Sequence, residues 1–140
     1  MNYSVDVRVT APVQDTELEE RVVEAVQALF PESEVTVEEG RVVASGHSVE
    51  RFADRLREQR ILDTARSHLR EHVRGDGLAF DLKKQAAREG VVNFVVGSPS
   101  ELGDIHVDIA VESPTAEEFV DYLAPRTDEE GTPVDDPRGG

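Results

Sequence analysis

Three arginines recur at intervals of four residues near the middle of the chain, at Arg66, Arg70 and Arg74. On an α-helix this spacing places all three on one face, where like charges repel each other. The repulsion is relieved either by ion pairs to Asp63 and Glu71 or by an anion bound along that face. Because the guanidinium fork binds phosphate through two hydrogen bonds, a phosphate backbone is the simplest such anion. The pattern leaves both interpretations open.

A second set of candidate residues surrounds the only two lysines of the chain, Lys83 and Lys84. A composition that avoids lysine, yet keeps both lysines side by side, indicates a role for that segment. The side chains of Gln85, Arg88 and Asn93 follow closely and offer donors and acceptors to base edges and 2′-hydroxyl groups. We therefore take Lys84, Gln85, Arg88 and Asn93, with the three arginines, as the candidate RNA-binding residues. The alternative is that the lysines protect an edge strand from aggregation.

No combination of residues indicates catalysis or a bound metal. His68 and His72 have the spacing of two metal ligands on a helix, but no third ligand follows them. Asp104 and His106 are spaced like an acid–base pair on one face of a strand, yet such polar pairs are common on strands. The turn Gly75–Gly77 lacks the Lys-Ser/Thr of a phosphate-binding loop. We expect no catalytic residue, no metal and no cofactor, and hence a protein that is not an enzyme.

The chain is strongly acidic, since 30 acidic and 15 basic residues give it a formal net charge of −15. An acidic surface with few lysines is typical of proteins that work in molar salt, where screening removes self-repulsion. We therefore predict a halophilic source, the alternative being an acidic protein that binds a basic partner. The charge is uneven, because residues 51–88 carry a net +4 and the rest of the chain carries −19.

Length and composition predict a single intracellular domain. A chain of 140 residues can bury enough surface for one core. The absence of cysteine excludes a disulfide framework and a thiolate metal site. No apolar run approaches the roughly 20 residues that span a bilayer, and no signal peptide precedes the first predicted strand. We expect a cytoplasmic protein without membrane association.

The spacing of apolar residues predicts the element order β-α-β-β-α-α-β-β-β-α. The predicted strands are residues 4–9, 35–38, 41–45, 78–82, 91–96 and 105–111, and the predicted helices are residues 16–29, 48–60, 62–74 and 115–123. The polar segment 83–89 either extends the strand before it or forms one helical turn. Thr16 with Glu19, and Thr115 with Glu118, have the spacing of capping boxes at helix starts.

This order predicts an α+β fold, a two-layer sandwich of a mainly antiparallel sheet with helices on one face. The other face of the sheet should be wet, because the predicted strands alternate apolar and polar residues. Residues 1–124 form the single predicted domain. Residues 125–140 are acidic and rich in Gly and Pro, which predicts a disordered tail.

The segment from Leu82 to Phe94 has the pattern L-x-K-Q-A-A-x-x-G-x-V-N-F, and Leu102 to Ile105 adds L-G-x-I. These motifs resemble the archaeal predicted exosome-subunit family, also described as an uncharacterised RNA-binding-domain family. Arg60–Arg66 resembles the same family, and the resemblance covers residues 3–124. It implies RNA binding and a fold similar to that of the ribosomal protein that binds 5S ribosomal RNA. Family members often have Asn in place of Lys83, so Lys83 is not carried over.

Two functions follow from these observations. The first is a non-catalytic RNA-binding protein associated with archaeal RNA processing or the exosome, supported by the basic stretch and the motifs. Against it stand the acidic total and the lack of an aromatic platform, because the five Phe and two Tyr fall mostly at predicted core positions. The second is a homodimeric assembly module that uses a sheet face or edge and binds no nucleic acid.

Overall fold

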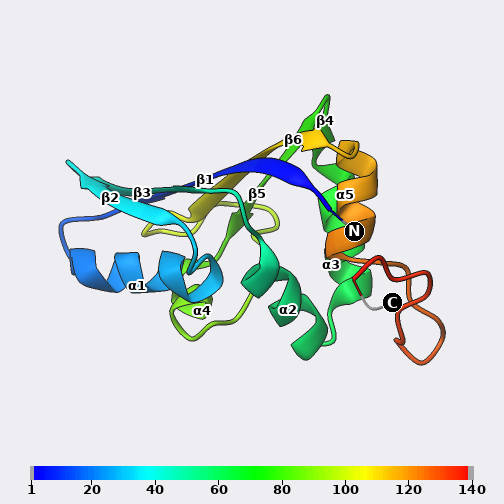
Figure 1. The fold of residues 1–140 in the computed structure, drawn as a ribbon. Helices are drawn as coiled ribbons and strands as arrows, with labels where there is room; N and C mark the ends of the chain where they lie inside the picture. Colours follow the sequence, from blue (N-terminus) through cyan, green and yellow to red (C-terminus); the bar gives the residue numbers. More distant parts are fainter. Residues whose placement is uncertain (1, 139–140) are drawn as a thin grey trace.

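A six-stranded antiparallel sheet organises the computed structural model, which describes residues 2–138, and its strand order is β2-β3-β1-β6-β5-β4 (Figure 1). The strands are β1 (Ser4–Pro12), β2 (Glu34–Glu38), β3 (Arg41–Gly46), β4 (Val73–Arg74), β5 (Gly77–Leu82) and β6 (Ile105–Ser113). The helices are α1 (Glu19–Leu29), α2 (Glu50–Glu58), α3 (Leu62–Glu71), α4 (Lys84–Arg88) and α5 (Ala116–Leu123).

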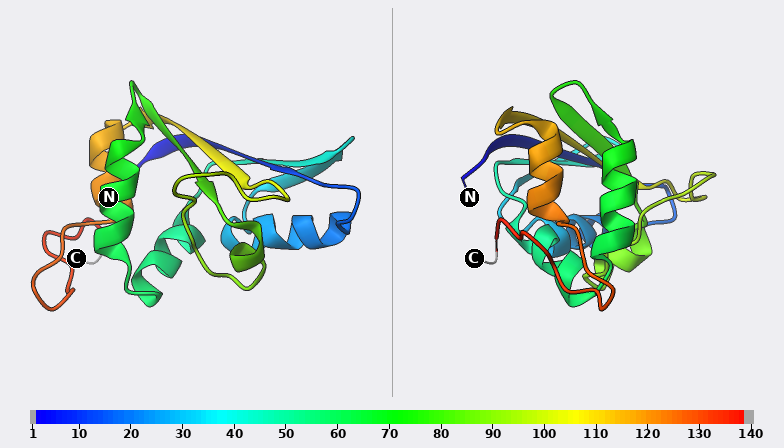
Figure 2. Two further views of the ribbon diagram at one scale, coloured as in Figure 1. Left: turned by 180° about the vertical axis from the view of Figure 1, so that it is seen from behind. Right: turned by 90° about the vertical axis from the view of Figure 1, so that its right-hand side faces the viewer.

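All the described helices lie on one face of the sheet, as Figures 1 and 2 show. Helices α1 and α4 lie at one end of this layer, α3 and α5 stand side by side at the other end, and α2 lies between them. The predicted α+β two-layer architecture is therefore confirmed. This layering separates two groups of candidate residues, because α3 and α4 lie at different ends.

The core fills the space between the sheet and the helices. On the central strands, alternate residues point into it and are fully buried or nearly so, as the alternation predicts: Val5, Val7, Val9, Ile105, Val107 and Ile109. Phe52 of α2 is completely buried, and its ring stacks on Phe30 and Phe80 at centroid distances of 5.5 Å each. The polar residues between the core positions of β1 and β6 line the open face of the sheet.

The strand predicted at residues 91–96 does not form. Its pairing is reduced to one isolated bridge between Leu82 and Phe94. The Gln59 side chain binds the backbone of Val92 in the way a neighbouring strand would, with Val92 N–H donating to Oε1 at 2.7 Å and Nε2 donating to the carbonyl at 3.0 Å. The side chain of Gln59, the residue after α2, thus satisfies the backbone of Val92. Two backbone hydrogen bonds of 2.9 Å, from Lys83 N–H to the Asn93 carbonyl and from Val95 N–H to the Asp81 carbonyl, flank the isolated bridge. The polar segment before it forms α4.

The prediction that three arginines share one helix is wrong for Arg74. Helix α3 ends at Glu71, and Arg74 lies in β4, opposite Gly77 of β5. The tight turn between these strands is possible because Gly75 adopts a φ of 58°, a conformation that costs glycine little. The local helical periodicity of residues 62–74 is therefore interrupted by a hairpin that pairs with the sheet.

The two predicted capping boxes have different outcomes. Thr115 caps α5, since its hydroxyl oxygen accepts a hydrogen bond from Glu118 N–H at 3.1 Å, as predicted. Thr16 does not cap α1, which begins at Glu19 without a side-chain cap. In that segment Glu17 is the residue that bonds to its surroundings, and its partner is a lysine far along the chain.

A cluster around Glu50 of α2 ties Tyr3, the residue before β1, and α5 to the end of the described chain. The Glu50 carboxylate accepts hydrogen bonds from the Tyr3 hydroxyl at 2.7 Å, the Tyr122 hydroxyl at 2.6 Å and Arg138 at 3.0 Å. Burial opposes the charged form of Glu50, but the hydrogen bonds from Tyr122, Tyr3 and Arg138 outweigh it and lower the pKa of Glu50. Burial and the bond to this carboxylate raise the pKa of Tyr122 to about 12.

Residues 125–138 lie against α2 and α5 and form ion pairs there. Arg138 also donates to Asp54 at 2.6 Å, and its guanidinium lies 5.7 Å from the centre of the Tyr122 ring. A second ion pair has its charges the other way round, because Arg57 of α2 donates to Asp136 of the C-terminal segment at 2.8 Å. The division into a domain of residues 1–124 and a disordered tail stays a prediction, and truncation tests it.

We expect truncation after Ala124 to lower the melting temperature by only a few degrees. The tail contributes mainly partly exposed ion pairs, each worth about 0.2–1 kcal/mol, and few apolar contacts. Thermal unfolding of the truncated and full-length chains in the same buffer measures the difference, with Arg138→Ala in the full chain as a control for the largest ion-pair cluster. A loss of more than about 10 °C would show that the tail is an integral part of the fold.

Candidate nucleic-acid interface

Lys84 is buried inside the protein. Its side chain is 7% exposed, and Nζ lies 2.9 Å from Glu17 Oε1, 2.7 Å from the carbonyl oxygen of Pro12 and 2.9 Å from that of Leu102. An ammonium group has three N–H donors, and these partners use all of them. Lys84 therefore joins α4 to the segment before α1 and to the loop before β6, and it presents no charge to a ligand.

Arg66 is engaged within the helical layer. It donates to the carboxylate of Asp121 at 2.6 Å and to the carbonyl of Ala124 at 3.1 Å, and its side chain is 15% exposed. The ion-pair interpretation of the arginine pattern thus applies to Arg66. The acid that pairs with it lies on α5, although the sequence pattern suggested Asp63.

Arg70 and Arg74 are exposed, and neither pairs with a carboxylate in the described part of the chain. Arg74 donates to the carbonyl oxygens of Glu71 and Val73 at 2.9 and 2.7 Å, which fixes its side chain near the end of α3. Arg70 faces solvent beside Arg66 in a hollow of about 500 Å³ at the α3–α5 end. These two guanidinium groups are free to meet an anion.

Gln85 and Arg88 are exposed on α4 and line a groove of about 390 Å³ between α4 and α1. Arg21 of α1 lines the same groove and, like Arg88, has no carboxylate partner among residues 2–138. Sequence reasoning misses Arg21, because only the packing of α1 against α4 brings it beside the lysine-containing motif. Asn93 is also exposed, and its carbonyl accepts a hydrogen bond from Lys83 N–H at 2.9 Å.

The seven candidates do not form one cluster. Arg66 and Arg70 line the hollow at the α3–α5 end, whereas Lys84, Gln85 and Arg88 line the groove at the α1–α4 end. Figure 2 shows α2 and the loop after α4 between these ends. A ligand that touches both groups must therefore be extended, as a nucleic-acid strand is.

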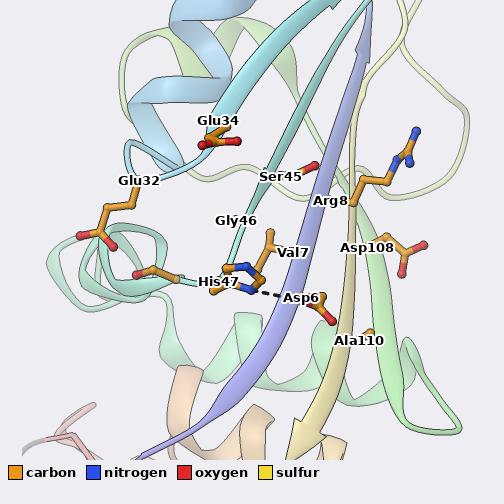
Figure 3. Close-up of a pocket in the computed structure, with 11 residues that line it drawn as sticks. Asp6, Val7, Arg8, Glu32, Glu34, Ser45, Gly46, His47, Asp108 and Ala110 are labelled. Atoms are coloured by element: carbon orange, nitrogen blue, oxygen red, sulfur yellow. Dashed lines mark ion pairs between the residues drawn. The ribbon is translucent and has the colours of Figure 1, made fainter.

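The open face of the sheet is unsuited to phosphate. A hollow of about 750 Å³ lies there, and Figure 3 shows the side chains around it. Its lining includes the four carboxylates of Asp6, Glu32, Glu34 and Asp108. Arg8 is the one guanidinium in this lining, and His47 lies 3.1 Å from Asp6. The surplus of negative charge repels a phosphate backbone, so the exposed arginines of the helical side remain the better candidates.

The structure shows different contacts for the histidines of the His68/His72 and Asp104/His106 patterns. His106 Nδ1 lies 2.8 Å from Asp81 on the neighbouring strand, because the β5–β6 register places these residues opposite each other, and it does not pair with Asp104. His68 and His72 stack on each other with ring centroids 4.2 Å apart. Among residues 2–138, no three His, Asp or Glu side chains are arranged to hold a metal ion.

Comparison with known proteins shows which family this chain resembles. A family model described as RNA binding matches residues 6–112, a range that contains all seven candidates. The chain is 42% identical over 121 residues to a UPF0201 protein of Methanothermobacter thermautotrophicus, covering 85% of this chain and 90% of that relative. It is 35% identical over 132 residues to a UPF0200/UPF0201 protein of Archaeoglobus fulgidus, covering 94% of this chain but only 40% of that longer relative.

Solved structures agree with this similarity. The crystal structure of a UPF0201 protein from Methanococcus jannaschii matches with a TM-score of 0.85 at 32% identity, covering 93% of this chain and 99% of that one. A second crystal structure, of an uncharacterised UPF0201 protein, matches with a TM-score of 0.82 at 34% identity, covering 92% of this chain and 99% of that one. In the described part of this chain, every helix is too short or too polar to cross a membrane.

Proposed function

This chain belongs to the archaeal UPF0201 family, whose model is described as RNA binding, and on that basis we propose that it is a non-catalytic RNA-binding protein. The observation that carries the proposal is the exposure of Arg70 and Arg88 without carboxylate partners, in a chain with 30 acidic residues. In so acidic a chain, a cation left without a nearby acid is available to a phosphate group.

The proposed contact set is Arg70, Arg74 and Arg88 for phosphates, with Gln85 and Asn93 for base edges or 2′-hydroxyl groups. All five side chains are exposed. Arg66 and Lys84 are left out, because the first pairs with Asp121 and the second is buried beside Glu17. They hold α3 and α4 in position.

We infer the cellular setting and the partner of the protein from the same observations. We propose that it acts in archaeal RNA processing in the cytoplasm, with the exosome as the first partner to test. We also propose a halophilic setting, because the net charge of −15 is best tolerated where salt screens it. Binding assays should therefore extend to molar KCl.

Charge reversal tests the proposed RNA contacts. We expect the wild-type chain to bind single-stranded RNA with an affinity that falls by about 0.7 log units per contacted phosphate for each tenfold rise in salt. Changing Arg70, Arg74 and Arg88 together to Glu should weaken binding by about a hundredfold or more at 0.1 M KCl, because three charge-assisted hydrogen bonds become repulsions. Mobility shift and fluorescence anisotropy measure the affinity.

The matched control reverses three arginines elsewhere, with the same change in net charge. Arg8 and Arg41 lie on the strands, and Arg51 lies on α2, outside the proposed contact set. Changing these three to Glu should weaken binding much less than the test variant does. If both variants lose the same affinity for RNA, the loss reflects the total charge of the chain and not the proposed contacts. If the test variant still binds RNA as tightly as the wild type, the proposed contacts are wrong.

A homodimer without nucleic acid is the second candidate. Two exposed apolar side chains favour it: Leu18 and Leu102, which are 54% and 38% exposed, line the same groove between α1 and α4. Size-exclusion chromatography in the absence of RNA measures the oligomeric state under the same salt conditions. If the wild-type chain binds no RNA at any salt concentration and elutes as a dimer, assembly replaces RNA binding as the function.

A further inference from the structure

A pocket of about 490 Å³ opens between the end of α3 and the loop before β6, outside the contact set proposed above. Its lining includes the aromatic rings of His68 and His72 and the carboxylates of Glu71, Asp81 and Asp104. The pocket has a volume typical of small-ligand sites. A ligand in this pocket would therefore meet both aromatic rings and carboxylate groups.

Three rings lie in sequence at this pocket, the first pair tilted and the second stacked. The rings of His68 and Phe94 have centroids 4.5 Å apart at 30°, and those of His68 and His72 have centroids 4.2 Å apart at 21°. Phe94 belongs to the core, and His72, which is partly exposed, ends the run at the pocket. Sequence patterns do not reveal this run of rings. Phe94 is predicted to lie in a strand, and His68 and His72 are considered as metal ligands and not as stacking rings.

Two buried polar atoms of the lining have no hydrogen-bond partner within the described chain: His68 Nε2 and Asp104 Oδ1. Buried polar atoms in native proteins nearly always have such a partner. The other oxygen of Asp104 accepts from Ser100 N–H at 3.0 Å, so Oδ1 is the oxygen left for a ligand. Burial, and then the neighbouring His72, lower the pKa of His68, which leaves this ring neutral at neutral pH.

The chemistry of the lining selects among ligands. The carboxylates repel a phosphate, and no three side chains of residues 2–138 are arranged to bind a metal. A ligand with a flat ring and N–H donors satisfies the platform and the free carboxylate oxygen together. Adenine, cytosine and guanine have an exocyclic amino group, whereas uracil places its one ring N–H between two carbonyl oxygens that the carboxylates would repel.

We propose that this pocket binds one unpaired nucleobase that carries an exocyclic amino group, with the base stacked on His72 and its amino group donating to Asp104. This inference rests on the proposed function, because the base belongs to a bound RNA strand. Arg74 donates a hydrogen bond to the carbonyl oxygen of Glu71, a residue that lines the pocket, so its guanidinium can hold a phosphate beside such a base. Arg70 lies in the hollow at the α3–α5 end and can hold the strand farther along. The acidic pocket thus receives the base, and Arg74 receives the backbone beside it.

Three ten-residue oligoribonucleotides of A, C or U test the inference, with affinities measured by fluorescence anisotropy at 0.1 and 1 M KCl. We expect oligo(A) and oligo(C) to bind about tenfold more tightly than oligo(U), the discrimination that one well-placed base contact provides. In Asp104→Asn, the amide oxygen can keep the bond to Ser100 while the amide N–H groups replace Oδ1. This variant should therefore shift the preference toward uracil, whose carbonyl oxygens accept hydrogen bonds.

A second variant tests stacking without touching the carboxylate. His72→Ala should weaken binding of all three oligonucleotides about tenfold, because the base loses its platform. His47→Ala is the matched control, since His47 lies on the open face of the sheet and should change nothing. Melting curves confirm that each variant is folded, and the wild-type preference stands as a test by itself.

The outcomes separate this inference from the proposed function. If all three oligonucleotides bind equally, and Asp104→Asn and His72→Ala leave their affinities unchanged, the inference is overturned while RNA binding stands. If none of the three binds at either salt concentration, the proposed function fails and the inference fails with it. A preference for A and C that shifts toward U in Asp104→Asn supports both.

Discussion

Replacing Lys84 with alanine is expected to lower the free energy of unfolding by about 3–5 kcal/mol, the usual cost of removing one partner of a buried ion pair. The substitution leaves the Glu17 side chain, which is 13% exposed, without its counter-ion. It also removes the Nζ donor from the carbonyl groups of Pro12 and Leu102, although Leu102 keeps a hydrogen bond of 3.3 Å from Gln14 Nε2. Chemical denaturation at a fixed KCl concentration measures the loss.

The neighbouring lysine provides a matched control. Lys83 is exposed and its side chain has no described partner, so Lys83→Ala should change the stability by less than about 0.5 kcal/mol. The double variant Glu17→Gln with Lys84→Met should recover part of the loss, because it removes both buried charges together. If Lys84→Ala is as mild as Lys83→Ala, the lysine is not held in the buried position described above.

Raising KCl from 0.1 to 1 M is expected to increase the melting temperature by about 3–7 °C. Two like charges about 20 Å apart in water repel by about 0.2 kcal/mol, and a net charge of −15 corresponds to about a hundred such pairs. A Debye length of about 10 Å at 0.1 M leaves roughly a tenth of this repulsion, and one of about 3 Å at 1 M removes nearly all of it. These figures leave about 2 kcal/mol of repulsion at 0.1 M, and since the unfolded chain repels itself as well, about 1–2 kcal/mol should appear as stability.

Calorimetry from 0.1 to 3 M KCl measures this effect, and charge removal provides its control. The variant Glu32→Gln, Glu34→Gln and Asp108→Asn removes three of the four carboxylates around the hollow in Figure 3. It should melt at a higher temperature than the wild type in 0.1 M KCl and respond less to added salt. A wild-type melting temperature that stays flat or falls over this range would contradict the halophilic proposal.

The sequence predicts the fold well wherever burial follows a local period. Val5, Val7 and Val9 alternate along β1 as expected, and the hairpin of β2 and β3 turns at Gly40, whose φ is 77°. The prediction fails where a side chain distant in sequence forms the hydrogen bonds that a neighbouring strand is expected to form. Gln59 binds the backbone of Val92, and no periodic signal within residues 91–96 reveals that contact.

The candidate site shows the same limit for charged residues. Residue type and spacing identify Lys84 and Arg66 as cations, but not the acids that neutralise them, which lie 67 and 55 residues away at Glu17 and Asp121. The exposed members, Arg70, Arg88 and Gln85, come from the same patterns and differ only in their surroundings. The spacing of charged residues therefore identifies side chains that could contact a phosphate. Tertiary packing determines which of them have no carboxylate partner within the protein.

The burial of Lys84 makes the protein a convenient substrate for amine chemistry. Of its two lysine side chains, only that of Lys83 is exposed, and Lys83 lies directly before α4 and its groove. An amine-reactive dye or cross-linker should therefore attach to one lysine of the folded chain, beside Gln85 and Arg88. Lys84 becomes reactive only when its ion pair with Glu17 opens, so modification located at Lys84 by peptide mass spectrometry reports how often that part of the molecule unfolds.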